Sequence, residues 1–225
     1  MKKNLNTLIK GVCVFLLYIL VPYVLDMFLP SLTKSNSFEL LYRFMFLFLM
    51  LIIFVFLYRK DLLNDLKAFK KDKKKVLLNA LMSFGLMLIG IAIISLIVTS
   101  ITGNTNGSSY ESSSVIDSLF QENKLLMIFY VFIISLFTEQ IVFRKVFKDI
   151  INNKIFFVIF SGMIYGLFQV GYNLSSSSDL LTLLPYTYMG IIVSSSYAKT
   201  DNILTPCFVY LLYDLFVLFA FTFNI

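Results

Sequence analysis

The stretch VLLNALMSFGLMLIGIAIISLIVTS, residues 76–100, contains no charged residue. A helix needs about 20 mostly apolar residues to cross the hydrocarbon core of a bilayer, so this stretch is long enough to span one. Six further apolar runs of comparable length surround it. We therefore expect spans at residues 11–29, 40–58, 76–100, 125–143, 155–173, 180–198 and 203–222.

The composition of the whole chain agrees with this pattern. Of its 225 residues, 59% are hydrophobic and 14% are charged, whereas a soluble domain has about 25% charged residues. The sequence predicts an all-α, polytopic integral membrane helical bundle of about seven transmembrane helices, a multi-pass protein of the cell membrane. We expect a single membrane domain over 1–225, made of N-terminal helices in 1–100 and a core bundle in 125–222.

Basic residues gather on one side of the predicted spans. That side contains 15 of the 19 Lys and Arg, while the loops of the other side contain only Lys34 and Lys124. Cytoplasmic loops are rich in Lys and Arg, so we expect a cytoplasmic N-terminus and a C-terminus outside. The net charge of +6 then favours membrane lipid, and not nucleic acid, as a partner. The basic segments are 1–10, 59–75, 145–154 and 199–202.

Two loops have distinct chemistry. The basic cytoplasmic loop 59–75 has 8 basic and 3 acidic residues. It is either an interfacial amphipathic helix on anionic lipid or a plain solvated loop. Residues 101–117 are rich in Gly, Ser, Asn and Thr, which predicts a flexible outer loop. The apolar residues of 59–75 at near-helical spacing are Leu62, Leu63, Leu66 and Phe69.

The chain is poor in metal ligands. It has no histidine and two cysteines, Cys13 and Cys207, each inside an apolar run. We expect both cysteines to be buried as small hydrophobic residues. Two cysteines cannot complete a tetrahedral zinc site, so we predict no metal and no cofactor.

Ionisable residues inside a membrane span are costly, which makes them candidates for function. Asp26 and Arg43 lie near the outer ends of their spans, where they can reach the interface. Arg144 lies inside or at the edge of the fourth span, while Glu139 and Asp214 have no such explanation.

The polar group in the fourth span has a definite spacing. On an α-helix, Gln140 and Arg144 are four residues apart and share a face, while Glu139 and Arg144 are five apart and do not.

The decapeptide TEQIVFRKVF, residues 138–147, resembles the first motif, EExxxR, of the CAAX-protease and bacteriocin-processing (CPBP, or Abi) intramembrane peptidases. The next span of that family contains FxxxH, and YGLFQ places Tyr165 and Gln169 in those two positions. A third motif has His and Asn four residues apart, and here Tyr210 and Asp214 follow Pro206 at that spacing.

The resemblance implies roles for the six motif positions. In the family, the first glutamate and the second-motif histidine activate water, while the third-motif His and Asn hold the oxyanion. Here Gln169 cannot act as a base, Tyr210 is a poor cation and an ionised Asp214 would repel an oxyanion. The candidate catalytic positions, all degenerate except the first glutamate and the arginine, are Glu139, Gln140, Arg144, Gln169, Tyr210 and Asp214.

We expect Gln169, Tyr165, Tyr210 and Asp214 to hydrogen-bond one another and Glu139, filling a former active-site cavity. The GxxxG sequence GMIYG, residues 162–166, should pack within the bundle and not form a dimer.

Two functions follow. The first is a catalytically degenerate CPBP-like protein that acts as accessory or regulatory partner of another membrane or envelope enzyme, such as a cell-wall hydrolase or the machinery of lipoprotein maturation and N-acylation. The alternative is an active intramembrane CAAX-type peptidase that uses Glu139, with Asp214 as a second carboxylate. A transporter is disfavoured because neither broken helices nor repeats are visible.

Overall fold

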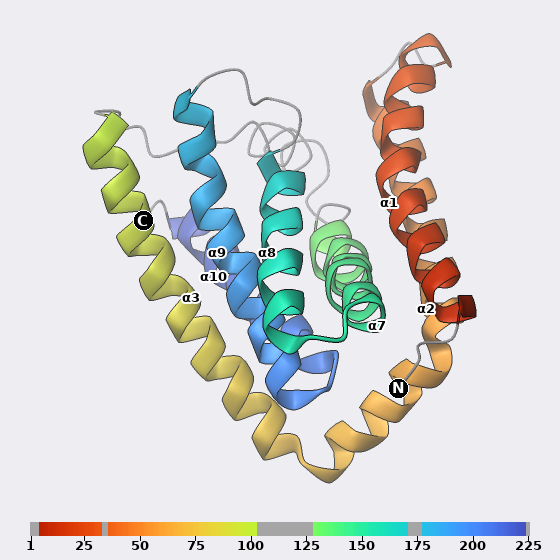
Figure 1. The fold of residues 1–225 in the computed structure, drawn as a ribbon. Helices are drawn as coiled ribbons and strands as arrows, with labels where there is room; N and C mark the ends of the chain where they lie inside the picture. The colour runs from red at the N-terminus through yellow and green to blue at the C-terminus, as the bar shows by residue number, and fades with distance from the viewer. Residues whose placement is uncertain (1–4, 33–35, 103–127, 171–176, 224–225) are drawn as a thin grey trace. The chain divides into compact units, whose positions relative to one another are not determined.

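The computed structural model describes residues 5–32, 36–102, 128–170 and 177–223 (Figure 1). Within these residues the chain is helical apart from short turns and contains no strand, which confirms the all-α prediction. Most of the predicted outer loop 101–117, and the side chains of Asp26 and Arg43, lie outside what the structure describes.

Each predicted span coincides with a helical stretch. The fourth is a composite of π-helical and α-helical turns, in the order η1, α6, η2 and α7, and the others are continuous α-helices. The elements are α1 (Leu5–Leu32), α2 (Asn36–Lys71), α3 (Lys73–Thr102), η1 (Tyr130–Ser135), α6 (Leu136–Glu139), η2 (Gln140–Val146), α7 (Phe147–Ile150), α8 (Lys154–Val170), α9 (Ser177–Thr200) and α10 (Leu204–Phe223).

The basic segment 59–75 is helical, as the first of its two sequence interpretations requires, and its place on anionic lipid stays a prediction. It forms the end of α2 and the start of α3, interrupted at Asp72. Among the described residues, Lys73–Ile101 is the one helix both long and apolar enough to pass a test for a membrane span. Shorter apolar helical stretches are Leu5–Val21, Lys154–Val170 and Leu204–Ala220.

The chain divides into two compact units, which we describe separately. Unit 1 comprises Met1–Leu63 and Glu111–Ile150, and unit 2 comprises Asn64–Tyr110 and Ile151–Ile225.

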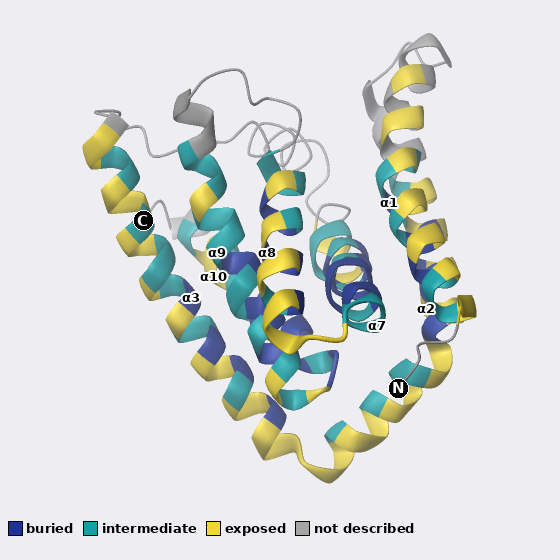
Figure 2. Ribbon diagram, in the orientation of Figure 1, coloured by how far each residue is buried: buried dark blue, intermediate teal, exposed yellow. Residues whose placement is uncertain are grey.

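The core of unit 1 forms where α1 packs against η2 and α7. Phe15 contacts Phe147 with ring centroids 5.1 Å apart, and Tyr18 meets Phe143 edge-on at 5.6 Å. Residues 140–147 are all buried except Lys145, which is half-buried (Figure 2). The segment that carries the first motif is therefore the interior of this unit.

In unit 2, small residues let α8 and α9 approach closely. A Cβ on Gly190 would stand 2.8 Å from the Cα of Gly162, so the two backbones touch. The buried hydroxyls of Ser161 and Ser194 form a hydrogen bond of 2.8 Å between the same helices. Gly166 faces Thr187 of α9 as well, which confirms that the GxxxG sequence packs inside the bundle.

A glycine also sets the contact between α3 and α9. The ring of Tyr188 lies directly over Gly90, where any Cβ would collide with it. Its hydroxyl donates a hydrogen bond of 2.9 Å to the carbonyl of Leu86. Because the ring occupies the space of the absent side chain, Tyr188 joins the two helices both sterically and through a polar contact.

Polar residues define the helix ends of unit 2. The Asn153 side-chain oxygen accepts from the amides of Ile155 and Phe156 at 2.9 and 3.1 Å, which begins α8. Asp72 accepts from the Lys75 amide at 3.2 Å and begins α3 in the same way. After α9, Asp201 adopts a φ of 53°, the left-handed conformation that commonly ends a helix.

Candidate functional site

The first-motif segment is wound differently from an α-helix. Glu139 ends α6 and directly precedes the π-helical η2, and η1 lies one α-turn earlier. A π-helix pairs residues five apart, whereas an α-helix pairs residues four apart. The expectation that Glu139 and Arg144 lie on different faces assumed α-helical geometry, whereas Gln140–Val146 is π-helical, so that expectation stays a prediction.

The carboxylate of Glu139 is held by its own helix. Ser135 Oγ donates a hydrogen bond of 2.6 Å to Glu139 Oε1. A hydroxyl bond to a charged acceptor at this length is of the strong kind. Sequence reasoning missed Ser135, although a serine four residues before the glutamate was a usable signal.

Gln140 and Arg144 lie at the centre of unit 1. Both side chains have 0% of their surface exposed, and Arg144 heads the largest fully buried side chains among the described residues. The Arg144 guanidinium lies 5.9 Å from the Phe143 ring centroid. The amide of Gln140 makes no hydrogen bond within the described part of the chain. Burying polar groups such as these lowers the free energy of unfolding, so the polar positions of this segment reduce the stability of the fold.

Unit 2 contributes the second and third motifs. Gln169 Nε2 donates a hydrogen bond of 2.7 Å to Tyr165 Oη, one turn earlier on α8. Tyr165 and Tyr210 meet edge-to-face with ring centroids 5.9 Å apart, and both are buried. Asp214 follows one turn after Tyr210 on α10 and is half-buried. The structure thus joins Gln169, Tyr165 and Tyr210 in one contact chain across α8 and α10.

This contact chain is chemically neutral. An amide and two phenols donate and accept hydrogen bonds but do not exchange a proton readily near neutral pH. The amide donates to a phenol oxygen, so it is already occupied within its own helix. The arrangement can bind and orient a polar group, but it offers no general base.

The six candidate positions divide between the two units. Glu139, Gln140 and Arg144 belong to unit 1, while Gln169, Tyr210 and Asp214 belong to unit 2. The expectation that the two groups surround one cavity stays a prediction.

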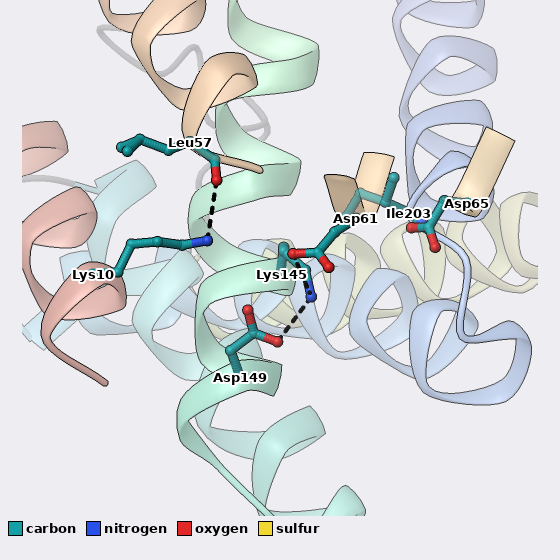
Figure 3. Close-up of polar contacts among 7 residues, drawn as sticks. All are labelled: Lys10, Leu57, Asp61, Asp65, Lys145, Asp149 and Ile203. Carbon is teal, nitrogen blue, oxygen red and sulfur yellow. Dashed lines mark hydrogen bonds and ion pairs between the residues drawn. The ribbon is translucent and has the colours of Figure 1, made fainter. Parts of the chain in front are cut away.

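A charged network stands next to the first motif on η2 and α7. Lys145 forms an ion pair of 2.9 Å with Asp149 and one of 3.4 Å with Asp61 of α2 (Figure 3). Burial of the Lys145 ammonium lowers its pKa, but the two carboxylates outweigh burial and hold the pKa above its usual value. These contacts tie α2 to the helix immediately after Arg144.

Lys10 completes the network from α1. Its ammonium lies 3.6 Å above the ring of the buried Tyr58 and donates a hydrogen bond of 3.2 Å to the Leu57 carbonyl. Partial burial lowers the pKa of Lys10, although Asp61 and Asp149 oppose the shift. Contacts within unit 1 therefore join the start of α1 to residues 57–61 of α2, and these to Lys145 of η2.

The described residues contain no group of three His, Cys, Asp or Glu arranged to hold a metal ion. Both cysteines are free, and Cys207 is buried as expected, but Cys13 is exposed. The expectation for Cys13 was wrong because an apolar run does not reveal which side of a helix faces the core. Here the neighbouring Leu16 and Leu17 are exposed with it.

Comparisons with known proteins point to one group. Residues 121–216 match the family described as type II CAAX prenyl endopeptidase Rce1-like. The chain is 29% identical over 154 residues to the membrane-embedded CAAX protease MroQ of Staphylococcus aureus (strain USA300). That match covers 66% of this chain and 59% of the relative, so the chain spans less than two thirds of the relative's length. No solved structure matches the chain significantly.

Proposed function

We propose that this chain is a catalytically degenerate member of the CPBP family of CAAX-protease-like membrane proteins, to which it is similar, and that it acts by binding. Its partner is a second membrane or envelope protein whose activity it assists or regulates. The observation that carries the proposal is the hydrogen bond from Gln169 to Tyr165, with Tyr210 against the same ring.

The argument is chemical. The chain has no histidine, and Gln169 and Tyr210 stand where the family resemblance expects one. Loss of a general base or of an oxyanion donor each costs a hydrolytic site about a hundredfold or more in rate. Two such losses would reduce the rate of hydrolysis to a low level. An ionised Asp214 at the third-motif position would reduce it further, because it would repel an oxyanion.

Binding needs less from the site. Glu139 is half-buried and can still contact a polar segment of another protein, while the fully buried Gln140 and Arg144 belong to the interior of unit 1. Candidate partners are a cell-wall hydrolase and the machinery of lipoprotein maturation or N-acylation. What these candidates share is a polypeptide that is membrane-bound or anchored to the bilayer by lipid.

We also propose the seven-span topology with a cytoplasmic N-terminus, in the cell membrane. Support comes from the ends of the helices. In unit 2 the described lysines lie around the ends where α2 and α9 finish and where α3 and α8 begin. A bias of this kind toward one end of the helices is what the positive-inside rule describes.

Restoring the family residues tests the proposal directly. The purified full-length protein in nanodiscs is incubated with a prenylated CAAX peptide and the released tripeptide is measured. We expect the wild type to release no more product than Glu139→Ala. A variant carrying Gln140→Glu, Gln169→His, Tyr210→His and Asp214→Asn should gain cleavage. Cleavage by the wild type that disappears in Glu139→Ala would overturn the proposal.

The binding role has its own test. Crosslinking in host membranes, followed by purification, should yield one partner in a near-stoichiometric amount with the wild type. Glu139→Gln should retain the same partner, because the substitution keeps shape and hydrogen bonding. Loss of the partner in Glu139→Gln, with normal expression, would argue against a purely structural role for this residue.

A second function, an active intramembrane peptidase, has one observation in its favour. Ser135 fixes the Glu139 carboxylate in a partly buried position, as a catalytic base requires, and the relative MroQ is named a protease. The peptide experiment decides between the two functions.

A further inference from the structure

Six lysines lie within nine residues at the junction of α2 and α3. All six side chains are exposed. The acidic residues nearby are engaged elsewhere, since Asp72 caps α3 and Asp65 bonds the turn before α10. The junction therefore presents a strongly cationic surface, which we call the lysine surface: Lys67, Lys70, Lys71, Lys73, Lys74 and Lys75.

The opposite side of this helical segment packs against other residues of unit 2, to which the segment belongs. Asp65 Oδ2 accepts the Ile203 amide at 2.9 Å (Figure 3). The Asp65 carbonyl accepts a hydrogen bond from Asn202 Nδ2 at 2.7 Å. One turn later, Phe69 packs on Phe208 of α10 with ring centroids 5.6 Å apart. Because its inner face is held at two successive turns, the helix cannot turn its lysines inward.

The exposed side is amphipathic. Lys67 is two residues from both Asp65 and Phe69, which places it on the far side of the helix. Beside it, Leu66 is 41% exposed. An exposed leucine among lysines suits the boundary between headgroups and acyl chains, where insertion of the apolar side chain and attraction of the cationic charges both strengthen binding. Binding to a nucleic acid would be strengthened only by the charges.

The position of α3 locates this boundary. Lys73–Lys75 form the first turn of the helix whose length and apolar composition suit a membrane span. Lysines at the end of a spanning helix lie at the headgroup level. We propose that the lysine surface binds the headgroups of anionic phospholipids, and that this contact holds the turn preceding α10 through Asp65 and Phe69.

The lipid contact would bear on function through α10. This helix begins at Leu204, next to the Asp65 contacts, and carries Tyr210 and Asp214. A bilayer rich in anionic lipid fixes the lysine surface at the headgroups and, with it, the start of α10. The inference does not depend on whether the protein cleaves peptides or binds a partner.

Titration of a fluorescent short-chain phosphatidylglycerol into the full-length protein in detergent tests the proposal. The test variant is Lys67→Gln, Lys70→Gln, Lys71→Gln. The matched control removes three other exposed lysines: Lys60→Gln, Lys154→Gln, Lys199→Gln. A lysine near an anionic membrane contributes about a fivefold gain in affinity, so the test variant should bind about a hundredfold more weakly and the control less than about tenfold.

Further arms separate the alternatives. Phosphatidylcholine with the same acyl chains should bind weakly to every variant, and rising salt should weaken phosphatidylglycerol binding to the wild type. Equal loss in the test and control variants, or equal binding of the two lipids, would overturn the proposal. If the glutamine variant fails to fold, Lys67→Arg, Lys70→Arg, Lys71→Arg serves in its place. It must bind as the wild type does, and weak binding by this folded variant would also overturn the proposal.

Discussion

Ser135 donates a hydrogen bond of 2.6 Å to the carboxylate of Glu139, one turn further along the same helical stretch. This contact orients the glutamate that matches the first glutamate of the motif EExxxR, which the chain resembles. It also means that the functional importance of Glu139 must be separated from its structural importance.

Removal of the Ser135 hydroxyl should therefore destabilise the protein modestly. We expect Ser135→Ala to lower the free energy of unfolding by about 1 kcal/mol, since a partly buried carboxylate loses a donor. Thermal unfolding in detergent measures the effect. Ser100→Ala is the matched control, because Ser100 also donates to its own helix, at 2.8 Å, but is exposed. Equal shifts of the unfolding midpoint in the two variants would show that the Ser135–Glu139 hydrogen bond stabilises the fold no more than an exposed one does.

Arg144 and Glu139 should respond differently to substitution. Arg144 is completely buried, so Arg144→Ala removes a large polar side chain from the interior and disrupts the packing around it. We expect a loss of about 3–5 kcal/mol and poor expression. Glu139→Gln should be well expressed, because the amide oxygen can still accept from Ser135. Quantitative membrane expression, with Lys148→Ala as control, checks this. Poor expression of Glu139→Gln together with normal expression of Arg144→Ala would contradict the prediction that Arg144, and not the charge of Glu139, is needed for stability.

Two glycines of α3 offer a test of helix packing. A Cβ at Gly90 would overlap the Tyr188 ring, whereas nothing lies within 4 Å of a Cβ at Gly85. Gly90→Ala should cost about 1–3 kcal/mol and break the Tyr188 hydrogen bond. Gly85→Ala should be neutral or stabilise the helix by about 0.5–1 kcal/mol. Unfolding midpoints compare the two variants, and Tyr188→Ala in the Gly90→Ala background should relieve the clash. Equal midpoints for the single variants would contradict this packing.

The ion pairs of Lys145 predict a pH dependence. Its pKa is raised in the folded protein by Asp149 and Asp61, so the contribution of Lys145 to stability is complete below the unfolded pKa. It is lost as pH rises through the folded value, above the usual lysine pKa of 10.5. The unfolding midpoint of the wild type should fall more steeply above about pH 10.5 than that of Lys145→Gln. Lys60→Gln, at an exposed site, should follow the wild type. Parallel curves for the wild type and Lys145→Gln would remove the ion pairs from the account of stability.

The sequence by itself determined the helices. Apolar runs must satisfy their backbone hydrogen bonds internally in a bilayer, so run length and position predicted a helical stretch at each of the seven runs, whereas they left the basic segment 59–75 open between a helix and a loop. Local spacing was also sufficient for contacts within one helix. Tyr165 and Gln169, four residues apart, are an example, because their separation is set by the helix itself.

Only the tertiary structure decided the contacts between elements and the departures from α-helical winding. Residues 140–146 are wound as a π-helix, which the apolar pattern of the fourth predicted span did not indicate. Likewise Asp65 reaches Ile203 across 138 positions of sequence, and Tyr188 covers Gly90. Apolar patterning cannot specify such pairs, because in a chain this hydrophobic almost every face of a helix could face the core. The face that does pack in the core is determined by small residues and by polar contacts between helices.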